Sequence, residues 1–343
     1  MEIGIVGLPG SGKSTLFEIM TGVKSRELHT ETCIRGLAAV PDDRLEHLAQ
    51  LYKPPKVTPA KVTFVDVHAA GEKAWSTLRQ NLSGSDGLLQ VIDGFTTGDL
   101  ADMVDAYRKL KDELILADLL VVENRLERLG KMSKAAFKPV DRLQLEVLPR
   151  VKEHLEQGQA VRQMNLTPEE AHALRSFSFW TIKPELIVLN MKEGLSAPVS
   201  DFKRETQTPS EVMGICVEVE AEIVTLPLEE RKDYLFAMGI EEPAFNRIIR
   251  EAFRLLRQIS FFTVGEDEVR AWMIPEGTKA PQAAGTIHND FERGFIKAEV
   301  VNYEEFVACG SQMQAVKNKG KLRLEGRDYV VKDGDIITFR FHV

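Results

Sequence analysis

The sequence predicts an α/β protein with a parallel sheet, an α-helical insertion and a small β-rich domain at its C-terminal end. In the first part of the chain, short apolar runs alternate with helical patterns, as they do in parallel α/β units. A charged stretch without strand signals, residues 99–183, interrupts this alternation. From residue 261 onward the chain becomes strand-like and rich in turns. These three observations together define the predicted fold class.

Length and composition are those of a multidomain globular protein. A chain of 343 residues is expected to form two or three domains. Its 43% hydrophobic and 28% charged residues are ordinary for a soluble protein. No run reaches about 18 apolar residues, and the chain opens as a strand rather than as a cleavable leader, so the sequence predicts neither a membrane span nor secretion.

Cysteine usage and charge narrow the expected compartment and partners. Cys33, Cys216 and Cys309 are far apart and form no CxxC pair. This pattern favours reduced thiols in a cytoplasmic protein and argues against a zinc site. A net charge of −8 gives the chain as a whole no attraction to nucleic acid. DNA is therefore not an expected partner, and any contact with RNA would have to be local.

The most informative segment is residues 7–15, Gly-Leu-Pro-Gly-Ser-Gly-Lys-Ser-Thr, which matches the pattern G-x-x-x-x-G-K-[ST]. It lies between the apolar run of residues 3–6 and the amphipathic stretch of residues 15–20. A glycine-rich turn lets several backbone N–H groups converge on phosphate oxygens, and a following helix adds the positive end of its dipole. We therefore expect a phosphate-binding loop (P-loop) formed by Gly7, Pro9, Gly10, Ser11, Gly12, Lys13, Ser14 and Thr15. Lys13 would contact the β- and γ-phosphates of a nucleoside triphosphate, and Ser14 would ligate Mg²⁺.

Further apolar runs predict the neighbouring strands. They are residues 62–65 before Asp66, residues 87–92 before Asp93, residues 186–189 before Asn190, and a last strand at residues 215–217. Asp66 is suited to hold Mg²⁺ through water, and a strand-end aspartate that caps a turn is the alternative. Thr30 and Thr32 are both candidates for the threonine that contacts Mg²⁺.

The segment after Asp66 departs from the pattern of a translational GTPase. Such proteins usually continue Asp-x-x-Gly, where the glycine amide reaches the γ-phosphate, and then carry a glutamine that orients the attacking water. Here Ala69 and Ala70 occupy these positions, and Ala70 cannot orient water. His68, a backbone group, a potassium ion or a partner would have to complete the site. For His68 a solvent-facing loop position is the other interpretation.

The tetrapeptide Asn190-Met191-Lys192-Glu193 bears on the choice of base. Guanine-specific P-loop proteins carry Asn-Lys-x-Asp after a late strand, because the Asp carboxylate accepts from guanine N1–H and N2–H. Here Met191 stands where the base-stacking lysine would be, and Glu193 replaces the aspartate with a longer stem. These changes predict a relaxed preference for guanine and use of ATP. The alternative is an ordinary surface turn.

Residues 99–183 predict a pair of antiparallel helices inserted into the sheet domain. Apolar residues recur at alternating spacings of four and three along a first helix and then along a second one, as in a coiled coil. The positions are Ile115, Leu119, Val122, Leu126 and Leu129, followed after a break by Leu148, Val151 and Leu155. Amphipathic helices that lie on the sheet are the alternative.

The end of the chain predicts a separate small domain. Residues 229–260 are helical, and the Asp333-Gly334 turn between apolar runs predicts a hairpin. The expected domains are therefore a sheet domain at residues 1–98 and 184–260, the helical insertion at 99–183 and a C-terminal domain at 261–343.

These motifs together resemble the YchF/Obg-like ATPase family, a branch of the translation-factor P-loop GTPases that prefers ATP. The resemblance is carried by the P-loop, by residues 40–45, by Asn190 with Glu193, and most specifically by residues 268–296 and 321–326. It implies a G-domain interrupted by a helical coiled-coil domain and followed by a TGS domain, which is a ubiquitin-like β-grasp. It also implies that Thr30 contacts Mg²⁺, that Phe95 and Met191 line the adenine, and that Ala70 is a hydrophobic substitute for the glutamine.

The function that this resemblance implies is an ATPase, with GTP as a second substrate, that acts as a switch on the ribosome (large subunit or 70S) or in a stress response. Residues 27–34 and 66–71 differ from the usual family pattern, so slow turnover is expected. The alternative function is a nucleotide-responsive scaffold with vestigial hydrolysis, whereas Met191 and Glu193 disfavour a GTP-specific Obg-type factor. RNA contact rests on a local basic cluster, for which a solvated hairpin face is the other interpretation: Lys317, Lys319, Lys321, Arg323 and Arg327.

Overall fold

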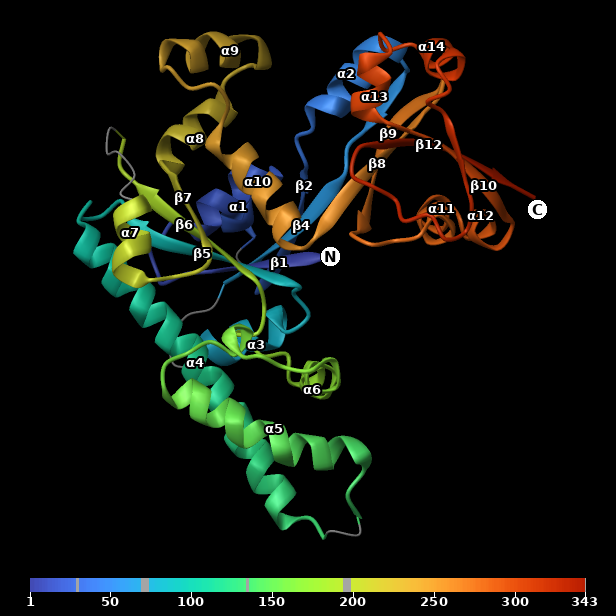
Figure 1. The fold of residues 1–343 in the computed structure, drawn as a ribbon. Coiled ribbons are helices and arrows are strands. Elements are labelled where there is room, and N and C mark those ends of the chain that lie inside the picture. Colours follow the sequence, from blue (N-terminus) through green and yellow to red (C-terminus); the bar gives the residue numbers. More distant parts are fainter. Residues whose placement is uncertain (29–30, 69–73, 134–135, 194–198, 343) are drawn as a thin grey trace. The chain divides into compact units, whose positions relative to one another are not determined.

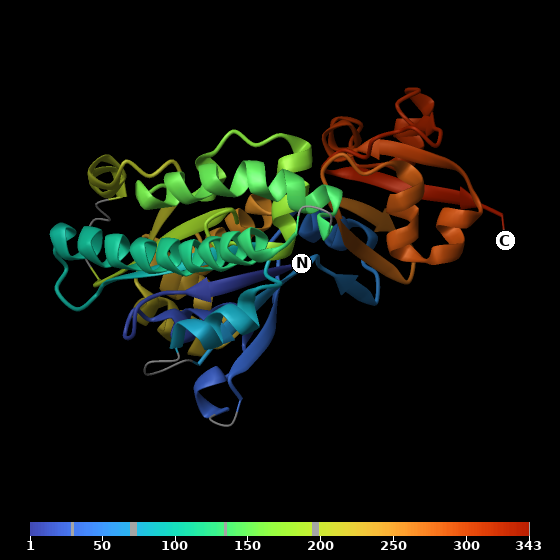
Figure 2. The same ribbon diagram turned by 90° about the horizontal axis from the view of Figure 1, so that it is seen from below.

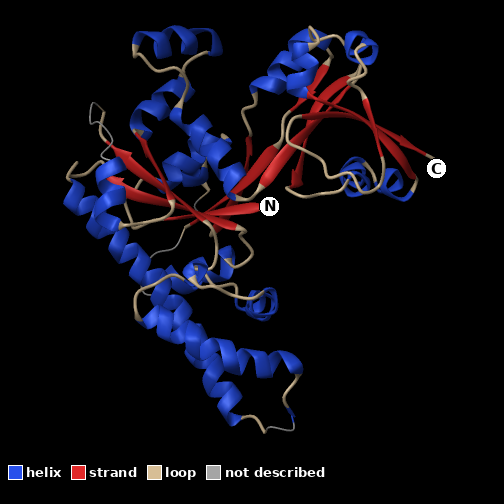
Figure 3. Cartoon of the chain, in the orientation of Figure 1, coloured by secondary structure: helices blue, strands red, loops and turns tan. Residues whose placement is uncertain are grey.

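A computed structural model describes residues 1–28, 31–68, 74–133, 136–193 and 199–342, and it divides the chain into two compact units (Figures 1 and 3). The first unit is Met1–Gly36 with Thr63–Phe245, and the second is Leu37–Val62 with Asn246–Val343. This division differs from the expected one in two ways. Residues 37–62 group with the C-terminal unit, and the helical insertion groups with the first sheet.

The first unit is built on a sheet with the strand order β2-β4-β1-β5-β6-β7. Its strands are β1 (Glu2–Val6), β2 (Cys33–Ala39), β4 (Lys61–Val67), β5 (Gly87–Gly94), β6 (Glu185–Met191) and β7 (Glu211–Ile215). The pairs β4–β1, β1–β5, β5–β6 and β6–β7 are parallel. Four expected strands are confirmed. The expected strand at residues 215–217 is wrong, because the strand ends at Ile215 and Val217 begins a helix.

Helices connect these strands and cover the sheet. The α-helices of the first unit are α1 (Lys13–Thr21), α3 (Ala74–Leu82), α4 (Leu100–Lys131), α5 (Pro139–Glu156), α6 (Pro168–Leu174), α7 (Val199–Thr206), α8 (Val217–Thr225) and α9 (Leu228–Ala237), and α10 (Ala244–Leu255) begins at its end. Short 3₁₀ turns are η1 (Ser25–Glu27), η3 (Val161–Gln163) and η4 (Arg175–Phe177). No helix in the described ranges is long and apolar enough to cross a membrane.

The long helix α4 serves two cores. Its first half packs Met103, Tyr107 and Leu110 against Ile187 of β6 and neighbouring sheet residues. Its second half packs against α5, which lies beside it (Figure 2). All the seam positions expected from the sequence belong to this second cluster, in which Val122 and Leu148 are fully buried. The antiparallel pair is therefore confirmed, and half of α4 also lies on the sheet.

The second unit is a mixed sheet with the order β11-β10-β12-β8-β9-β3. Its strands are β3 (Lys56–Thr58), β8 (Gln258–Val264), β9 (Glu268–Pro275), β10 (Phe295–Asn302), β11 (Arg323–Glu325) and β12 (Asp335–Phe341). Its helices are α2 (Asp43–Tyr52), α11 (Ala280–Ile287), α12 (Asn289–Arg293), α13 (Tyr303–Ala308) and α14 (Met313–Asn318). Alanines of α11 are fully buried against Phe261, Ile274 and Val300, so small side chains bring this helix close to the sheet.

The hairpin expected at Asp333-Gly334 is wrong. Gly334 does turn the chain with a positive φ of 83°, but β12 pairs antiparallel with β10 and parallel with β8 rather than with the segment just before the turn. A turn signal identifies where the chain reverses. It does not say which strand the next one joins.

Residues 37–62 belong to the second unit for reasons that can be named. Strand β3 pairs with β9, from Lys56 opposite Glu268 onward. Arg44 in α2 donates to Asp42 at 2.8 and 2.9 Å and to Asp333 at 2.7 Å, and its guanidinium lies over the ring of Phe262. These contacts fix the first turn of α2 to the loop before β12.

We predict that Arg44→Ala loosens α2 while the rest of the second unit stays folded. The change removes four charge-assisted hydrogen bonds from a side chain that is 29% exposed, so a loss of about 1–2 kcal/mol in the local free energy of opening is expected. Amide hydrogen exchange of α2 measures it. Arg254→Ala is the matched control, because Arg254 is 68% exposed and its ion pair is with Glu251 of its own helix. Equal exchange of α2 in the two variants would contradict the assignment.

Candidate functional site

The candidate site lies where parallel strands end together. The register pairs Asp93 with Asn190, and Asn190 with Ile215, so the ends of β5, β6 and β7 are level. The P-loop follows β1, and Asp66 lies at the end of β4, which pairs with β1. Ligands of open parallel sheets bind outside this carboxyl edge. The topology therefore brings the expected P-loop, Asp66 and Asn190 to one edge.

The P-loop has the backbone geometry that its glycines predict. Gly10 and Gly12 have φ values of 83° and 89°, in the left-handed region that favours glycine. A side chain at Gly7 would meet Ser11 Oγ and the Val91 carbonyl oxygen, both at 2.6 Å. Gly12 is the N-cap of α1, so the unpaired N–H groups of the first helical turn are available to an anion. The expected order of strand, turn and helix is present.

The polar side chains of the loop differ in burial. Lys13, Ser14 and Thr15 form the first turn of α1 and are half-buried, whereas Pro9 is exposed. Burial lowers the pKa of Lys13 below that of an ordinary lysine, and the Asp66 carboxylate opposes this shift. A poorly solvated ammonium interacts strongly with phosphate, because less water has to be displaced when the two meet.

Asp66 is fully buried and only half of its carboxylate is engaged. Its Oδ2 accepts from Ser25 Oγ at 3.0 Å and lies 3.2 Å from His68 Nε2. Its Oδ1 has no hydrogen-bond partner among the described residues. A buried, unpaired carboxylate oxygen is costly unless something else satisfies it.

This arrangement fits a magnesium ion. Mg²⁺ keeps several waters and takes one or two protein ligands together with substrate phosphates, so it does not need a dense cluster of acids. None of the described parts of the chain holds such a cluster of three or more histidine, cysteine or acidic side chains. The free Oδ1 of Asp66 is suited to receive a metal-bound water, and the Ser14 hydroxyl is suited to be a direct ligand.

The segments expected to sense the γ-phosphate are only partly described. Thr30 and Ala70 lie outside the described residues. Thr32 is exposed, and its carbonyl oxygen accepts from the His68 N–H at 2.9 Å. The described part of this region thus ties Thr32 to His68, and His68 in turn lies against Asp66.

A cavity of about 550 Å³ opens beside the P-loop. It is lined by Gly10, Gly12, Thr15, Phe95, Asn190, Val217, Glu218, Ala221, Glu222 and Thr225. Phe95 is positioned by Asp93, whose carboxylate accepts from the N–H groups of Phe95 and Thr96 and from the Thr96 hydroxyl. A lining that includes an aromatic ring and the P-loop suits a ligand that is both planar and anionic.

Asn190 holds two walls of this cavity together. Its Nδ2 donates to the Ser11 carbonyl at 3.1 Å, and its Oδ1 accepts from the Val217 N–H at 3.2 Å. Its amide also limits the loop, because a side chain on Gly12 would meet Asn190 Nδ2 at 2.5 Å. One side chain thereby fixes the P-loop and the N-terminus of α8.

Two expected base-lining residues do not line the cavity. Met191 is buried in the core cluster that includes Met103 and Phe202, because consecutive side chains of a strand point to opposite faces and Asn190 faces the P-loop. Glu193 is exposed beyond the end of β6. Instead, Lys192 places its Nζ 5.9 Å from the centre of the Phe95 ring.

Sequence reasoning missed several residues of the site. Lys192 stands inside the tetrapeptide Asn190-Met191-Lys192-Glu193, so its positive charge beside the expected base-lining residues was the available signal. Ser25 gave no such signal, and the α8 residues Glu218 and Glu222 were not assigned to the site. Glu218 directly follows residues 215–217, which were expected to be a strand, and the structure places it in the first turn of α8 instead.

Comparison with known proteins identifies close relatives over the whole length. The chain is 37% identical to the "Ribosome-binding ATPase YchF" of Escherichia coli O157:H7, covering 100% of this chain and 99% of that protein. It is 36% identical to the protein of the same name from Bacillus subtilis (strain 168), covering 100% of both. It is 35% identical to "Obg-like ATPase 1" of Oryza sativa subsp. japonica, covering 100% of this chain and 92% of that protein.

A solved structure and a family model agree with these relatives. The Schizosaccharomyces pombe YchF GTPase superimposes with a TM-score of 0.86 at 27% identity, covering 99% of this chain and 97% of that one. Residues 258–342 match the family model YchF-GTPase_C, described as a protein of unknown function (DUF933). The predicted fold class, with its parallel sheet, helical insertion and C-terminal sheet domain, is confirmed by this structural match. The chain belongs to the YchF family.

Proposed function

We propose that this chain binds ATP with Mg²⁺ in the cavity beside the P-loop, hydrolyses it slowly, and uses the bound nucleotide as a switch on the ribosome. The observation that carries the proposal is the cavity itself. It joins a P-loop of the required backbone geometry to an aromatic wall, with Asn190 fixing both. Relatives named as ribosome-binding ATPases support the reaction and the partner.

The roles of the residues follow from their positions. Lys13 binds the β- and γ-phosphates, and the N–H groups of the loop surround them. Ser14 would hold Mg²⁺ directly and Asp66 would hold it through water, and the ion would neutralise charge that develops on the phosphates. His68 is held next to Asp66 and Thr32, so it is the described side chain best placed to orient water. Thr30 and Ala70 keep the roles that the family resemblance implies.

The proposed use of ATP rests on Met191 and Glu193, which replace the lysine and the aspartate that recognise guanine in other P-loop proteins. Glu193 is exposed past the strand end, and Met191 packs in the core. Neither side chain then forms the aspartate–lysine pair that reads and stacks guanine. Phe95 and Lys192 are left to contact the base, and contacts of this kind tolerate either base, so the preference for guanine is lost. The preference for ATP over GTP is then what the family resemblance implies.

The proposed contact with ribosomal RNA is limited to one basic cluster, and acidic partners within the chain neutralise part of the charge of this cluster. Within the basic cluster, Lys321 pairs with Glu305, Arg323 lies 3.7 Å from Glu325, and Arg327 donates to the Phe295 carbonyl. Internal partners therefore take up part of its charge. Binding by this cluster should weaken with salt only modestly, since the slope follows the number of phosphates neutralised.

We predict that Asn190→Ala weakens nucleotide binding without unfolding the chain. The Ser11 carbonyl and the Val217 N–H each lose a partner, so the loop and α8 are no longer fixed, and the affinity for Mg·ATP should fall about tenfold or more. Calorimetric titration measures it. Asn318→Ala is the matched control, because Asn318 is exposed and its side-chain oxygen accepts from Gln314 of the same helix. An unchanged affinity in Asn190→Ala would remove Asn190 from the site.

We also predict that phosphate release from ATP exceeds release from GTP and depends on Mg²⁺. Release should be measured for both nucleotides, with and without K⁺ and ribosomes, and should stop when the metal is chelated or when Lys13 is changed to Ala. A strong preference for GTP would refute the argument from Met191 and Glu193. Binding without release above the Lys13→Ala background in every condition would instead support the scaffold with vestigial hydrolysis.

A further inference from the structure

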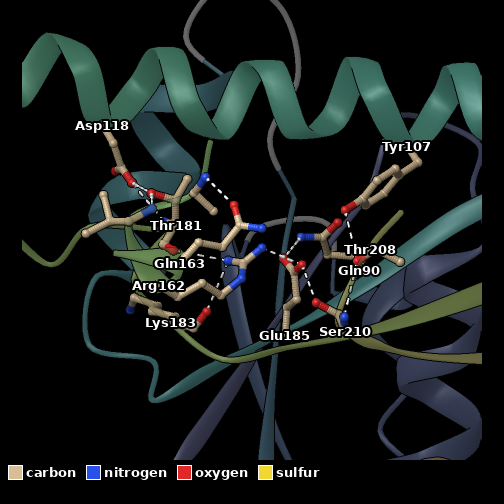
Figure 4. Close-up of polar contacts among 12 residues, drawn as sticks. Gln90, Tyr107, Asp118, Arg162, Gln163, Thr181, Lys183, Glu185, Thr208 and Ser210 are labelled. Carbon is tan, nitrogen blue, oxygen red and sulfur yellow. Dashed lines mark hydrogen bonds and ion pairs between the residues drawn. The ribbon is translucent and has the colours of Figure 1, made fainter. Parts of the chain in front are cut away.

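A cluster of buried polar residues, called the junction below, lies next to α4 (Figure 4). Its centre is the segment Trp180 to Glu185, which leads into β6 and is called the junction segment below. Its side chains Thr181, Lys183 and Glu185 are 2%, 7% and 4% exposed. Polar groups this deeply buried are costly unless each has partners, and here those partners come from four different elements.

The first element is α4, through Asp118. This carboxylate is fully buried and accepts from the Trp180 N–H at 2.9 Å, from the Thr181 N–H at 2.8 Å and from the Thr181 hydroxyl at 2.8 Å. Burial raises the pKa of Asp118, and these hydrogen bonds oppose the shift. Asp118 lies between Ile115 and Leu119, at the start of the half of α4 that pairs with α5. The junction segment therefore fixes α4 at this point.

The second element is α3, which is tied at two places. Lys183 Nζ donates to the carbonyl oxygens of Leu82 at 3.0 Å and Ser83 at 2.9 Å, at the C-terminal end of α3. Arg79 in α3 donates to the Ala117 carbonyl at 2.9 Å and lies 3.5 Å from Asp118. Lys183 thus ties the end of α3 to the junction segment, and Arg79 ties α3 to α4 beside Asp118.

Helix α3 and the junction segment also share an apolar cluster with the nucleotide edge. Val6, which directly precedes the P-loop, and Val67, which directly follows Asp66, pack in one cluster with Leu82 and Trp180. All four are 2% exposed or less. A shift at the end of β1 or β4 is therefore transmitted by packing to both α3 and the junction segment, since close-packed cores do not absorb such shifts.

The third and fourth elements are the return from α5 and the neighbouring strands. Arg162 in η3, which follows α5, donates to the carbonyl oxygens of Thr181 and Lys183 and forms a close ion pair with Glu185. Glu185 also accepts from Gln90 of β5 at 2.5 Å and from Ser210, just before β7, at 2.7 Å. The junction segment is therefore bound both by α4, through Asp118, and by the residues that follow α5, through Arg162.

We propose that the junction segment couples the nucleotide site to the α4–α5 pair, so that the bound nucleotide sets how firmly this pair is held. Arg79 and Asp118 are the positioning residues of this connection. The inference rests on the proposed function, because it concerns regulation of the same nucleotide site. In this view the helical pair is the part of the first unit that reports the nucleotide state to a partner.

Hydrogen exchange of the full chain tests the coupling. Amides of α5 and of the second half of α4 are compared with Mg·ADP bound and with Mg²⁺ plus a non-hydrolysable ATP analogue bound. We expect exchange rates in the wild type to differ between the two states by about fivefold or more, the lower end of ordinary allosteric coupling. In Arg79→Ala and in Asp118→Asn the difference should shrink to about twofold or less, while calorimetry shows each nucleotide affinity within about threefold of the wild type.

The readout is a difference between two nucleotide states, so a merely destabilised protein does not imitate the result. Arg79 is partly exposed, which makes Arg79→Ala the safer variant should Asp118→Asn fold poorly. Arg128→Ala is the matched control, because Arg128 is an exposed arginine in the last turns of α4. It should keep the full wild-type difference.

The possible failures can be told apart. Failure of the wild type to bind either nucleotide refutes the proposed function. Binding of both nucleotides with equal exchange of α5 in the two states refutes the coupling alone. A wild-type difference that survives in both Arg79→Ala and Asp118→Asn refutes the route through the junction segment.

Discussion

The candidate site depends on one side-chain amide. Asn190 joins the carbonyl of Ser11, in the loop after β1, to the N–H of Val217, the first residue of α8 after β7. A parallel sheet brings such groups to one edge, but it does not fix the distance between them. The amide does so, because a donor and an acceptor on one rigid group need both partners at hydrogen-bond distance. The small Gly12 is the complement of this contact, since any larger residue would displace the amide.

The sequence pointed to several candidate site residues at strand ends, but not to Lys192, which directly follows β6. Apolar runs located β1, β4, β5 and β6, and the polar residue after each run then had to lie at the same sheet edge. Asp66 and Asn190 were found in this way, and the P-loop pattern supplied the glycines. Phe95 came from the family resemblance, and the structure accounts for its position through the turn that Asp93 caps.

Two features could not be predicted: the face of a strand to which a side chain points, and the sheet to which a segment belongs. Strand β6 is buried at all seven positions, so it lacks the alternation that would have separated Asn190 from Met191. Residues 37–62 contain α2 and β3, and their local sequence does not say which sheet they join. Only long-range contacts, such as that of Arg44 with Asp333, decide the choice. Pairing of β12 with β8 is likewise a property of the whole sheet rather than of a turn.

The buried junction contains polar contacts where apolar side chains would give equal or greater stability. Replacing a buried ion pair by well-packed apolar side chains is often neutral or stabilising, so stability alone does not account for Asp118, Arg162 and Glu185. These groups fix the orientation of α4 relative to the sheet, because hydrogen bonds are directional whereas apolar contacts allow packed elements to slide past each other. A helix of 32 residues that serves two cores needs such a fixed point. If the bound nucleotide changes the affinity of the α4–α5 pair for a partner, linkage requires that binding of this partner changes the affinity for the nucleotide by the same factor.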